Sequence, residues 1–372
     1  MNLRVKIINI FITLIVFATL VPFINVFPSY SIQAICMLGS ALYIASPILR
    51  NPKMTRSSFF ILVFFAGWLF ISSSGFTVSR ISYYVALASF MLWAVGSEKI
   101  NYAEKFPEIM IKATGLISAV STIYFAYDKG AYADYARSRY PEDAAILIQD
   151  NINGNIAGLY NNYSKNGMVL SIAVGILFVS FLYSKTSRDK KRNMIMLLLC
   201  AAALLFTGKR GPVIFCIITL LICYSLYLGK NFSINKILRI ISLIVGTVIL
   251  FVVLSSFIPQ LSRFLQRFEE AEGAGSIMMG RDIYYEYAIS MFLSKPLVGH
   301  GWFSFGDVFA QNAHNVYLQL LAETGIVGFI FFIIAFGYLL YVAVHEYRRA
   351  QVCKNRFAMG RLLKSVFVII FF

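Results

Sequence analysis

The sequence predicts an all-α polytopic membrane protein with about ten or eleven transmembrane helices. Of its 372 residues, 59% are hydrophobic and only 13% are charged, whereas soluble domains carry about 25% charged residues. The mean hydropathy of the chain is +0.73. Aromatic residues make up 16% of the sequence, and this excludes a disordered polypeptide because disordered chains are poor in aromatic residues.

Ten apolar stretches are long enough, or nearly so, to be membrane spans, because a bilayer-crossing helix needs about 20 mostly apolar residues. They are Ile7–Phe27, Tyr30–Leu49, Ser58–Phe76, Ile81–Val95, Ile109–Tyr127, Gly167–Tyr183, Met194–Thr207, Val213–Leu228, Ile240–Ile258 and Thr324–Val344. Ile81–Val95 and Met194–Thr207 are short, so we expect each to cross with little tilt or to break and re-enter. An eleventh stretch begins near Ser365 and stops at Phe372, so we expect it to be incomplete.

Lysine and arginine gather in alternate loops, and this pattern predicts the orientation of the chain. The basic segments are the N-terminus and residues 50–56, 99–112, 185–192, 230–239 and 348–364. The basic face of a membrane protein is cytoplasmic, so we expect the N-terminus in the cytoplasm and Ile7–Phe27 as an uncleaved first span. These segments account for nearly all of the net charge of +16. The charge therefore predicts topology and a lipid bilayer as partner, and no nucleic acid.

We treat residues 1–372 as one membrane domain with two long segments on the outer face, 128–166 and 259–315. The second segment contains an apolar stripe at helical spacing, formed by Leu261, Phe264, Leu265 and Phe268. This stripe predicts either an amphipathic helix at the membrane surface or an ordinary packed helix. We expect another helix at Asp282–Leu293, before Pro296. Loops of this length often carry function.

Three polar motifs on the outer face are candidates for chemistry. They are Gly208-Lys209-Arg210-Gly211-Pro212, Gly280-Arg281-Asp282, and His314-Asn315 followed by Glu323. Lys209 and Arg210 oppose the charge bias of the chain, so they are either snorkelling charges in a turn or ligands of an anion. Arg281 is either an anion ligand or half of a local salt bridge. His314 is either a structural hydrogen bonder or a proton acceptor.

Other classes of site find no support in the sequence. The five cysteines show no CxxC spacing and four lie in apolar runs, so we expect small buried hydrophobic residues. No HxxxH, HExxH or acidic cluster accompanies His314, which argues against a metal site. A GxxxxGK[ST] motif is also absent from the sequence, so ATP-driven transport has no support.

The layout of the three motifs resembles the superfamily of O-antigen ligases and Wzy-type O-antigen polymerases, which are bacterial envelope glycosyltransferases. The resemblance covers roughly Asn151 to Val344. Its motifs are Asn151-Ile152-Asn153-Gly154-Asn155, Gly208-Lys209-Arg210-Gly211, Gly280-Arg281, Pro296-Leu297-Val298-Gly299-His300-Gly301, and His314-Asn315 through Glu323-Thr324-Gly325-Ile326-Val327-Gly328. Lys209 stands where many relatives have serine, which we treat as a tolerated departure.

The resemblance implies an enzyme of the bacterial inner membrane whose active site faces outward. It transfers a glycan from an undecaprenyl-diphosphate donor to an acceptor hydroxyl. We expect Arg210 and Arg281 to stabilise the leaving diphosphate, with Lys209 as a weaker helper, and His314 to accept or steer the acceptor proton. Glu323 and Asn315 would support the site. We expect no cofactor and no metal, and inversion at the anomeric carbon.

Two sub-functions and one different class remain open from the sequence. A polymerase would extend a lipid-linked surface polysaccharide and could act together with a chain-length regulator protein, and we favour this function. A ligase would move the finished glycan onto lipid A core or another acceptor. A transporter or flippase for a lipid-linked anion would place charged residues within its spans, and the predicted spans are nearly free of charge.

Overall fold

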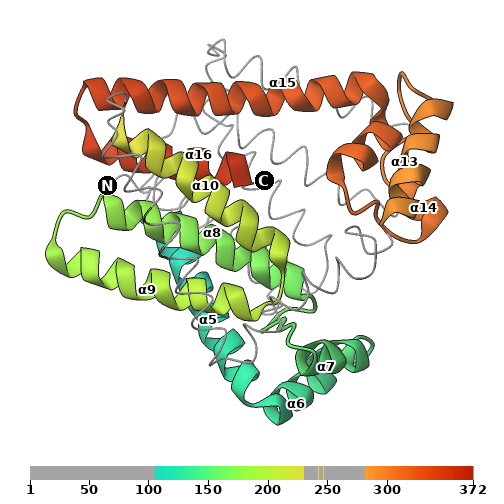
Figure 1. Cartoon of the computed structure of the whole chain (residues 1–372), viewed down its shortest axis with the longest axis horizontal. Helices are drawn as coiled ribbons and strands as arrows, with labels where there is room; N and C mark the ends of the chain where they lie inside the picture. Colours follow the sequence, from blue (N-terminus) through green and yellow to red (C-terminus); the bar gives the residue numbers. More distant parts are fainter. Residues whose placement is uncertain (1–104, 230–241, 243–245, 247–280, 372) are drawn as a thin grey trace, which may run out of the picture. The chain divides into compact units, whose positions relative to one another are not determined.

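The computed structural model describes residues 105–229, 242, 246 and 281–371 of the chain (Figure 1). The described residues form α-helices joined by loops and turns, with no β-strand among them. The first four predicted spans, the stripe Leu261–Phe268 and all of the span Ile240–Ile258 except residues 242 and 246 lie outside the described residues. The helices are α5 (Lys105–Tyr127), α6 (Lys129–Arg139), α7 (Ala144–Ile152), α8 (Tyr163–Leu182), α9 (Ser187–Phe206), α10 (Arg210–Leu228), α13 (Asp282–Ser294), α14 (Ser304–Phe309), α15 (Val316–Val352) and α16 (Arg356–Phe371).

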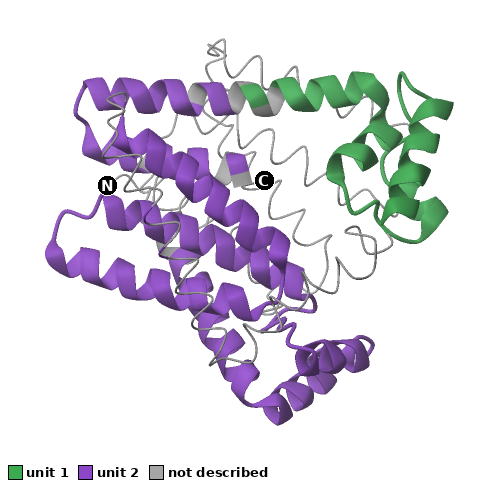
Figure 2. Cartoon of the chain, viewed as in Figure 1, with its two compact units in different colours: residues 1–19, 24–107, 271–339 green, residues 20–23, 108–270, 340–372 purple. Residues whose placement is uncertain are grey.

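The chain divides into two compact units, coloured separately in Figure 2. Unit 1 contains α13, α14 and the first part of α15, and unit 2 contains α5 to α10, the last part of α15 and α16. Three helices are long and apolar enough to cross a membrane, within residues 163–182, 210–228 and 316–334 of the described chain. The fold is therefore that of an all-α polytopic membrane protein, as the sequence predicted.

Helix α8 is the centre of unit 2 and packs against α9, α10 and α16. It has 20 residues, which gives a length of about 30 Å at 1.5 Å per residue, close to the thickness of the hydrocarbon core of a bilayer. Two thirds of its apolar window, 67%, is buried inside the protein. A helix that is apolar on all sides is buried among other helices, and this is the position that α8 occupies.

The short span Met194–Thr207 is part of one unbroken helix, α9, rather than a re-entrant segment. Helix α9 begins at Ser187, where the hydroxyl of Thr186 accepts a hydrogen bond from the backbone N–H of Asp189 at 3.0 Å. This N-cap satisfies one of the free N–H groups at the helix start. The first two turns contain Arg188, Lys190, Lys191 and Arg192, and hydropathy alone therefore missed the true beginning of this helix.

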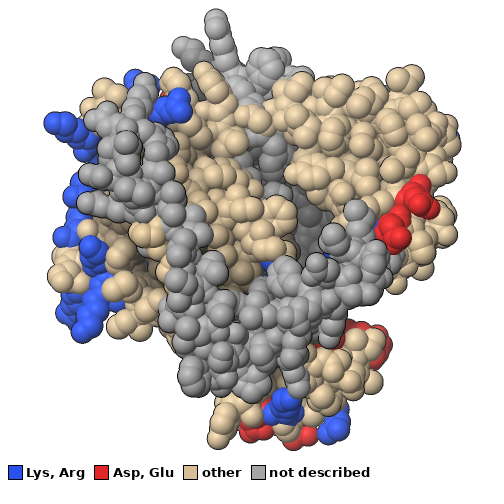
Figure 3. Space-filling model, viewed as in Figure 1, with Lys and Arg blue, Asp and Glu red and all other residues tan. Residues whose placement is uncertain are grey.

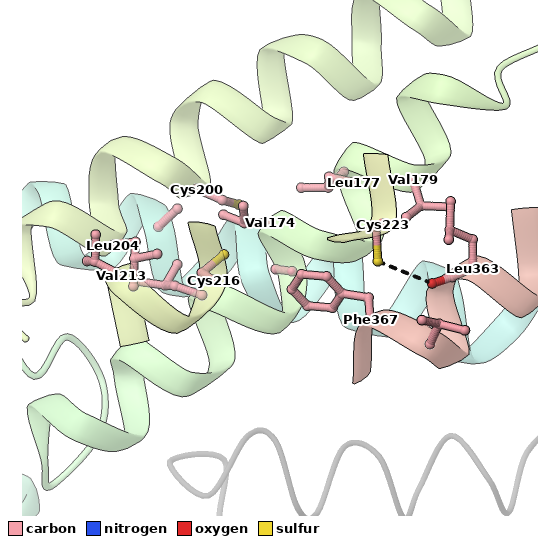
Figure 4. Packing of buried hydrophobic residues seen from close by; sticks show 14 of the residues in the cluster. Val174, Leu177, Val179, Cys200, Leu204, Val213, Cys216, Cys223, Leu363 and Phe367 are labelled. Atoms are coloured by element: carbon pink, nitrogen blue, oxygen red, sulfur yellow. Dashed lines mark hydrogen bonds between the residues drawn. The ribbon is translucent and has the colours of Figure 1, made fainter. Parts of the chain in front are cut away.

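The core of unit 2 depends on close contacts at glycines and on small buried side chains (Figure 4). A Cβ at Gly115 would collide with Ala173, and one at Gly175 would collide with the ring of Phe367. Small residues let transmembrane helices approach closely. Three cysteines are buried in this part of the chain, Cys200, Cys216 and Cys223, and Cys353 is exposed. The three buried residues behave as the small hydrophobic residues that the sequence predicted.

The final helix, α16, is longer than the apolar stretch from Ser365 indicated, because it begins at Arg356. Hydropathy did not detect this beginning because the first turns of α16 contain basic residues. Helix α16 packs against α8 and α10, and it buries Leu363, Val366 and Phe367 completely. The Sγ atom of Cys223 in α10 lies 3.9 Å from the carbonyl oxygen of Leu363 (Figure 4). Helix α16 is thus part of the core of unit 2.

One end of unit 2 carries the basic loops of the described chain, and Figure 3 shows their lysines and arginines gathered there. This end contains the loop between α8 and α9 and the loop between α15 and α16. Near these loops, the hydroxyls of Tyr183 at the end of α8 and Tyr347 in α15 form a hydrogen bond of 2.8 Å. The exposed basic residues are Lys185, Arg188, Lys190, Lys191, Arg192, Arg348, Arg349, Lys354 and Arg356. They come from two of the segments that the sequence assigned to one face.

A carboxylate pairs with two lysines near this end. Glu108 of α5 lies 2.6 Å from Lys112 Nζ and 2.5 Å from Lys364 Nζ of α16, and it accepts a hydrogen bond of 2.9 Å from the hydroxyl of Ser180 in α8. Burial alone would raise the pKa of Glu108, but the two ammonium groups lower it to about 2. The pairing ties α5, α8 and α16 together.

Residues 128–162, most of the first outer segment, form a packed helical subdomain rather than an extended loop. Asp128 caps α6 by accepting a hydrogen bond of 2.9 Å from the N–H of Ala131. Helices α6 and α7 pack on each other, around a cluster that includes Phe125, Tyr132 and Leu147. Burial raises the pKa of Tyr132 above its usual range. The sequence identified the segment but not its two helices.

Two asparagines, Asn151 of the asparagine-rich motif and Asn166 of α8, hold this subdomain on the membrane helices. Asn151 Nδ2 donates a hydrogen bond of 3.2 Å to the carbonyl oxygen of Phe125 at the end of α5. Asn166, in the first turn of α8, donates to Thr122 Oγ1 at 2.8 Å and to the carbonyl oxygen of Ile156 at 3.1 Å. Both asparagines are buried. Their role in the described structure is to satisfy backbone and hydroxyl groups where the loop meets the helices.

Candidate functional site

The first candidate motif, Lys209-Arg210, lies at the start of α10 in unit 2. Lys209 is the N-cap residue and Arg210 is the first residue of the helix. The first N–H groups of a helix have no partner within it and carry a partial positive charge. Two cationic side chains therefore stand where the helix itself already favours an anion. Both residues are half-buried.

Local packing fixes the backbone of this turn. Gly208 has φ of +68°, a conformation that glycine adopts without strain. The Thr207 hydroxyl donates to the carbonyl oxygen of Leu204 at 2.7 Å, which closes the end of α9. Ser171 Oγ in α8 donates to the carbonyl oxygen of Pro212 at 3.3 Å. The turn is thus held against the first half of α8, at the opposite end of that helix from the basic loops.

Tyr163, the first residue of α8, contacts the side chain of Lys209. The Nζ atom of Lys209 lies 4.5 Å from the centre of the Tyr163 ring. This cation–π contact stabilises an ammonium group without neutralising its charge. It holds the side chain of Lys209 against the first residue of α8.

The other candidate residues belong to unit 1. Arg281 is exposed and is the N-cap residue of α13, with its carbonyl oxygen accepting from Tyr285 N at 3.0 Å. One turn later, the ring of Tyr284 contacts the ring of His314, with 5.9 Å between their centroids. Helix α13 therefore connects Arg281 to the loop that carries His314.

His314 is exposed and has a strained backbone. Its φ is +54°, a left-handed conformation that non-glycine residues seldom adopt. Such conformations persist where the surrounding structure holds them, and they concentrate at functional sites. The next residue, Asn315, caps α15 by accepting hydrogen bonds from Tyr317 N at 3.0 Å and Leu318 N at 3.2 Å. Asn315 therefore has a structural role in the described chain.

Glu323 lies within α15 and is buried, with 4% of its surface exposed. Its Oε1 atom accepts a hydrogen bond of 3.0 Å from Gln319 Nε2. A buried carboxylate is costly unless hydrogen bonds satisfy it. Gln319, one helical turn earlier, supplies one of these bonds from the same helix.

The backbone of Glu323 and its neighbours in α15 pairs with a second motif that lies more than twenty residues earlier in the chain. Helix α15 is broken at Gly325, where φ is +65° and ψ is −172°. The break frees the carbonyl oxygens of residues 322 and 323 and the N–H groups of residues 326 and 327. The segment 296–301 pairs with all four groups, through His300 N to Ala322 O at 3.1 Å, Gly301 N to Glu323 O at 2.8 Å, Ile326 N to Pro296 O at 2.8 Å and Val327 N to Leu297 O at 3.2 Å.

Glycine is required on both sides of this crossing. Gly299 has φ of +68°, and a Cβ there would collide with the backbone of Glu323. A Cβ at Gly325 would collide with the backbone of Leu297. Nearby, His300 Nε2 lies 3.0 Å from the carbonyl oxygen of Met291 and 2.7 Å from Ser294 Oγ, which ties the segment to α13. We refer to this pairing of residues 296–301 with residues 322–327 as the glycine clamp.

The structure therefore brings four of the six predicted residues, Arg281, His314, Asn315 and Glu323, into one unit. Lys209 and Arg210 lie side by side in the other unit. Sequence reasoning missed Tyr163, Tyr284 and Gln319. A signal for Gln319 was present, because it stands four residues before Glu323 and so shares its face of a helix. The contact of Lys209 with Tyr163 joins two helices across the fold, and no local spacing predicts it.

Comparison with known proteins identifies the part of the chain that contains these residues. Residues 195–333 match the family model described as O-antigen ligase. All six candidate residues fall within this segment. No curated protein matches the chain.

Proposed function

Because residues 195–333 match the family model described as O-antigen ligase, we propose that the protein transfers a glycan from an undecaprenyl-diphosphate donor to an acceptor hydroxyl at the outer face of the bacterial inner membrane. The observation that carries this proposal is the cationic pair at the start of α10. The pair lies at the end of α8 away from the basic loops, and the positive-inside rule therefore supports an outer position for it.

The donor has a chemistry that suits these cations. It presents a diphosphate at the membrane surface, and one of its phosphates is bonded to the anomeric carbon of a sugar. In the reaction, the acceptor oxygen forms a bond to the anomeric carbon while the bond from that carbon to the phosphate oxygen breaks. The electron pair of the broken bond remains on the diphosphate. Negative charge therefore grows on the leaving group in the transition state.

We assign the stabilisation of this charge to Arg210, with Lys209 as a helper. A guanidinium presents a planar fork that binds phosphate oxygens in a bidentate manner. Charge stabilisation that is stronger in the transition state than in the ground state lowers the barrier. We assign the same role to Arg281, whose exposed position leaves its side chain accessible to a substrate.

His314 is the proposed proton acceptor. A neutral imidazole accepts a proton near neutral pH, so it would take the hydroxyl proton as the acceptor oxygen attacks. Its exposed side chain and strained backbone support a role in chemistry rather than in packing. We propose that Glu323 and Asn315 support this histidine through the structure of α15. Direct displacement predicts that the configuration at the anomeric carbon is inverted.

We propose that the reaction needs no metal ion and no cofactor. Arginine and lysine side chains neutralise a diphosphate by themselves, and this removes the chemical need for a divalent cation. Among the described residues, no group of three histidine, cysteine, aspartate or glutamate side chains is placed to hold a metal. Transfer that stops when a chelator is added, and resumes with Mg²⁺, would contradict this proposal.

Of the two sub-functions, we favour the polymerase, which extends a lipid-linked surface polysaccharide. A ligase would use the same donor chemistry with lipid A core or another acceptor. A transporter is less well supported, because each span identified in the described chain has an apolar window with at most two charged residues, whereas carriers of charged substrates place charged groups within the membrane.

Deletion of the gene, followed by gel analysis of the surface glycan, separates these functions. A polymerase predicts that the deletion strain displays a single repeat unit on its surface. A ligase predicts that long glycan accumulates on the lipid carrier and is missing from the surface. An unchanged surface glycan would reject both. Complementation with wild-type protein and with Arg210→Ala ties the phenotype to the proposed chemistry.

A further inference from the structure

The strained conformation of His314 needs a support, because a left-handed backbone is unfavourable at a non-glycine residue. The residue before it, Ala313, is completely buried, whereas His314 itself is exposed. The chain therefore passes from the core to the surface within one residue. Whatever holds the backbone of Ala313 also sets the position from which His314 projects.

Gln319 holds this backbone. Its Oε1 atom accepts a hydrogen bond of 3.2 Å from the N–H of Ala313, and its Nε2 atom donates a hydrogen bond of 3.0 Å to Glu323 Oε1. A backbone N–H can only donate, so the amide oxygen must face Ala313 and the amide nitrogen must face the carboxylate. Each neighbour thus requires the same orientation of the Gln319 amide.

The far end of this chain of hydrogen bonds is anchored in the glycine clamp. Glu323 is buried, and its backbone carbonyl oxygen accepts from Gly301 N at 2.8 Å. Gln319 therefore connects the loop of His314 to the most constrained part of unit 1. Hydrogen bonds at both polar ends of Gln319 restrict the rotation of its amide, so the side chain links the His314 loop to Glu323 in one arrangement.

We propose that Gln319 is a positioning residue for the transfer reaction, which holds the His314 loop at a fixed distance from the carboxylate of Glu323. This inference rests on the proposed function, because it takes His314 as the proton acceptor. Gln319 does not touch the donor or the acceptor in this account. Its loss should lower the rate of the chemical step and leave donor binding nearly unchanged, since misplacement of a catalytic group by about 1 Å costs roughly 100-fold in rate.

The test uses the purified full-length protein in nanodiscs with an undecaprenyl-diphosphate-linked glycan. Gln319→Met keeps the length and volume of the side chain and removes both hydrogen bonds. We expect it to lower kcat at least about tenfold and to change the KM for the donor by less than about twofold. The matched control is Gln311→Met in the same loop, where the glutamine is exposed. This control should retain wild-type kcat.

Two further variants show whether Gln319 acts through Glu323. Gln319→Glu retains an acceptor for Ala313 N but directs a second carboxylate at Glu323, so we expect a loss at least as large as that of Gln319→Met. If the two residues act as a unit, the double variant Gln319→Met with Glu323→Gln should be no less active than the single variant that has the lower activity. Fully additive losses would contradict the proposed connection.

The outcomes also separate this inference from the proposed function. If His314→Ala abolishes transfer while both Gln319 variants match the Gln311→Met control, then the positioning role is wrong and the proposed function stands. If His314→Ala transfers glycan normally, the proposed function has failed instead. Rates are normalised to the folded fraction measured by size-exclusion chromatography. Should Gln319→Met fail to fold, Gln319→Glu with control-level kcat overturns the inference by itself.

Discussion

At the scale of single residues, we expect both the charge and the planar geometry of the Arg210 guanidinium to contribute to the reaction. Arg210→Ala is expected to lower transfer about 100- to 1,000-fold, the range seen when one donor that stabilises a developing anion is removed. Arg210→Lys restores the charge without the planar fork, so we expect only partial recovery. The measurement is kcat/KM with a lipid-linked donor. Arg137→Ala, which removes an exposed arginine of α6, is the control and should have no effect.

Arg210→Lys with full activity would show that a point charge is sufficient and that bidentate binding is not used. Lys209 is expected to matter less. Its ammonium group already makes a cation–π contact with Tyr163, so it has less capacity to bind the diphosphate. Lys209→Ala should therefore lower kcat/KM by about tenfold, the effect of losing about 1.4 kcal/mol of transition-state binding.

Glu108 predicts a pH dependence of stability at the acidic end of the scale. The nearby lysines hold its pKa near 2, below the value of about 4.3 expected in an unfolded chain. A lowered carboxyl pKa stabilises the folded state above the unfolded pKa, and this contribution is lost as the pH falls through the folded pKa. We therefore expect the Tm in detergent to fall between about pH 4.3 and pH 2.

Glu108→Gln should remove much of this pH dependence and lower stability at pH 7. The substitution leaves Lys364, whose side chain is 18% exposed, without its counter-charge. Breaking a buried pair costs about 3–5 kcal/mol, and we expect a loss of about 2–3 kcal/mol because the carboxylate keeps some contact with solvent. Glu142→Gln changes an exposed carboxylate and is the control. Equal Tm values for the two variants would contradict a stabilising pair.

At the scale of elements, the glycine clamp predicts that Gly325 cannot be replaced. Gly325→Ala must adopt φ of +65° and would collide with the backbone of Leu297. The expected result is a loss of several kcal/mol, more than the 1–2 kcal/mol of the left-handed conformation alone, because the collision adds to it. The measurement is the yield and Tm of folded protein, and transfer activity should fall with them.

Gly337→Ala is a control within the same helix. A Cβ at Gly337 meets nothing within 4 Å, and alanine favours a helix over glycine by about 1 kcal/mol. This variant should fold as well as wild type or better. If Gly325→Ala behaves like Gly337→Ala, the break in α15 is not required for the fold.

Hydropathy could predict the existence of the helices but not all of their ends. The cores of α8 and α10 are apolar throughout, and both were found within a few residues. Helices α9 and α16 begin in basic turns, which hydropathy cannot distinguish from loops. Helices α6 and α7 are short and mixed in character, so only their tertiary packing reveals them. The break at Gly325 was equally invisible, because its partner segment lies more than twenty residues earlier in the chain.

At the scale of the whole molecule, the positions of the basic residues predict which end of unit 2 faces the cytoplasm. Cys353 is exposed in the basic loop between α15 and α16. In a variant that keeps only this cysteine, a membrane-impermeant maleimide should label permeabilised spheroplasts but not intact ones. Lys165→Cys, in the first turn of α8, introduced as the single cysteine of the chain, should be labelled in both permeabilised and intact spheroplasts. The reverse pattern would invert the topology and place Lys209 and Arg210 in the cytoplasm.

The residue types of the candidate site could be predicted from the sequence, whereas their supports could not. Lys209, Arg210, Arg281 and His314 stand out because they are polar groups in an apolar chain, and the family match covers all of them. Gln319 and Tyr163 act through contacts that depend on the fold. The sequence describes Glu323 as an acid near a span, but only the structure shows that it is buried and hydrogen-bonded.

The central claim is that the cations and the histidine drive glycan transfer from a lipid diphosphate. The most direct measurement is transfer by purified protein supplied with an undecaprenyl-diphosphate-linked glycan and a glycan acceptor, comparing wild type with Arg210→Ala, Arg281→Ala and His314→Ala. We expect a longer glycan with wild type and a loss of about 100-fold or more with each variant. Undiminished transfer by all three folded variants would contradict it.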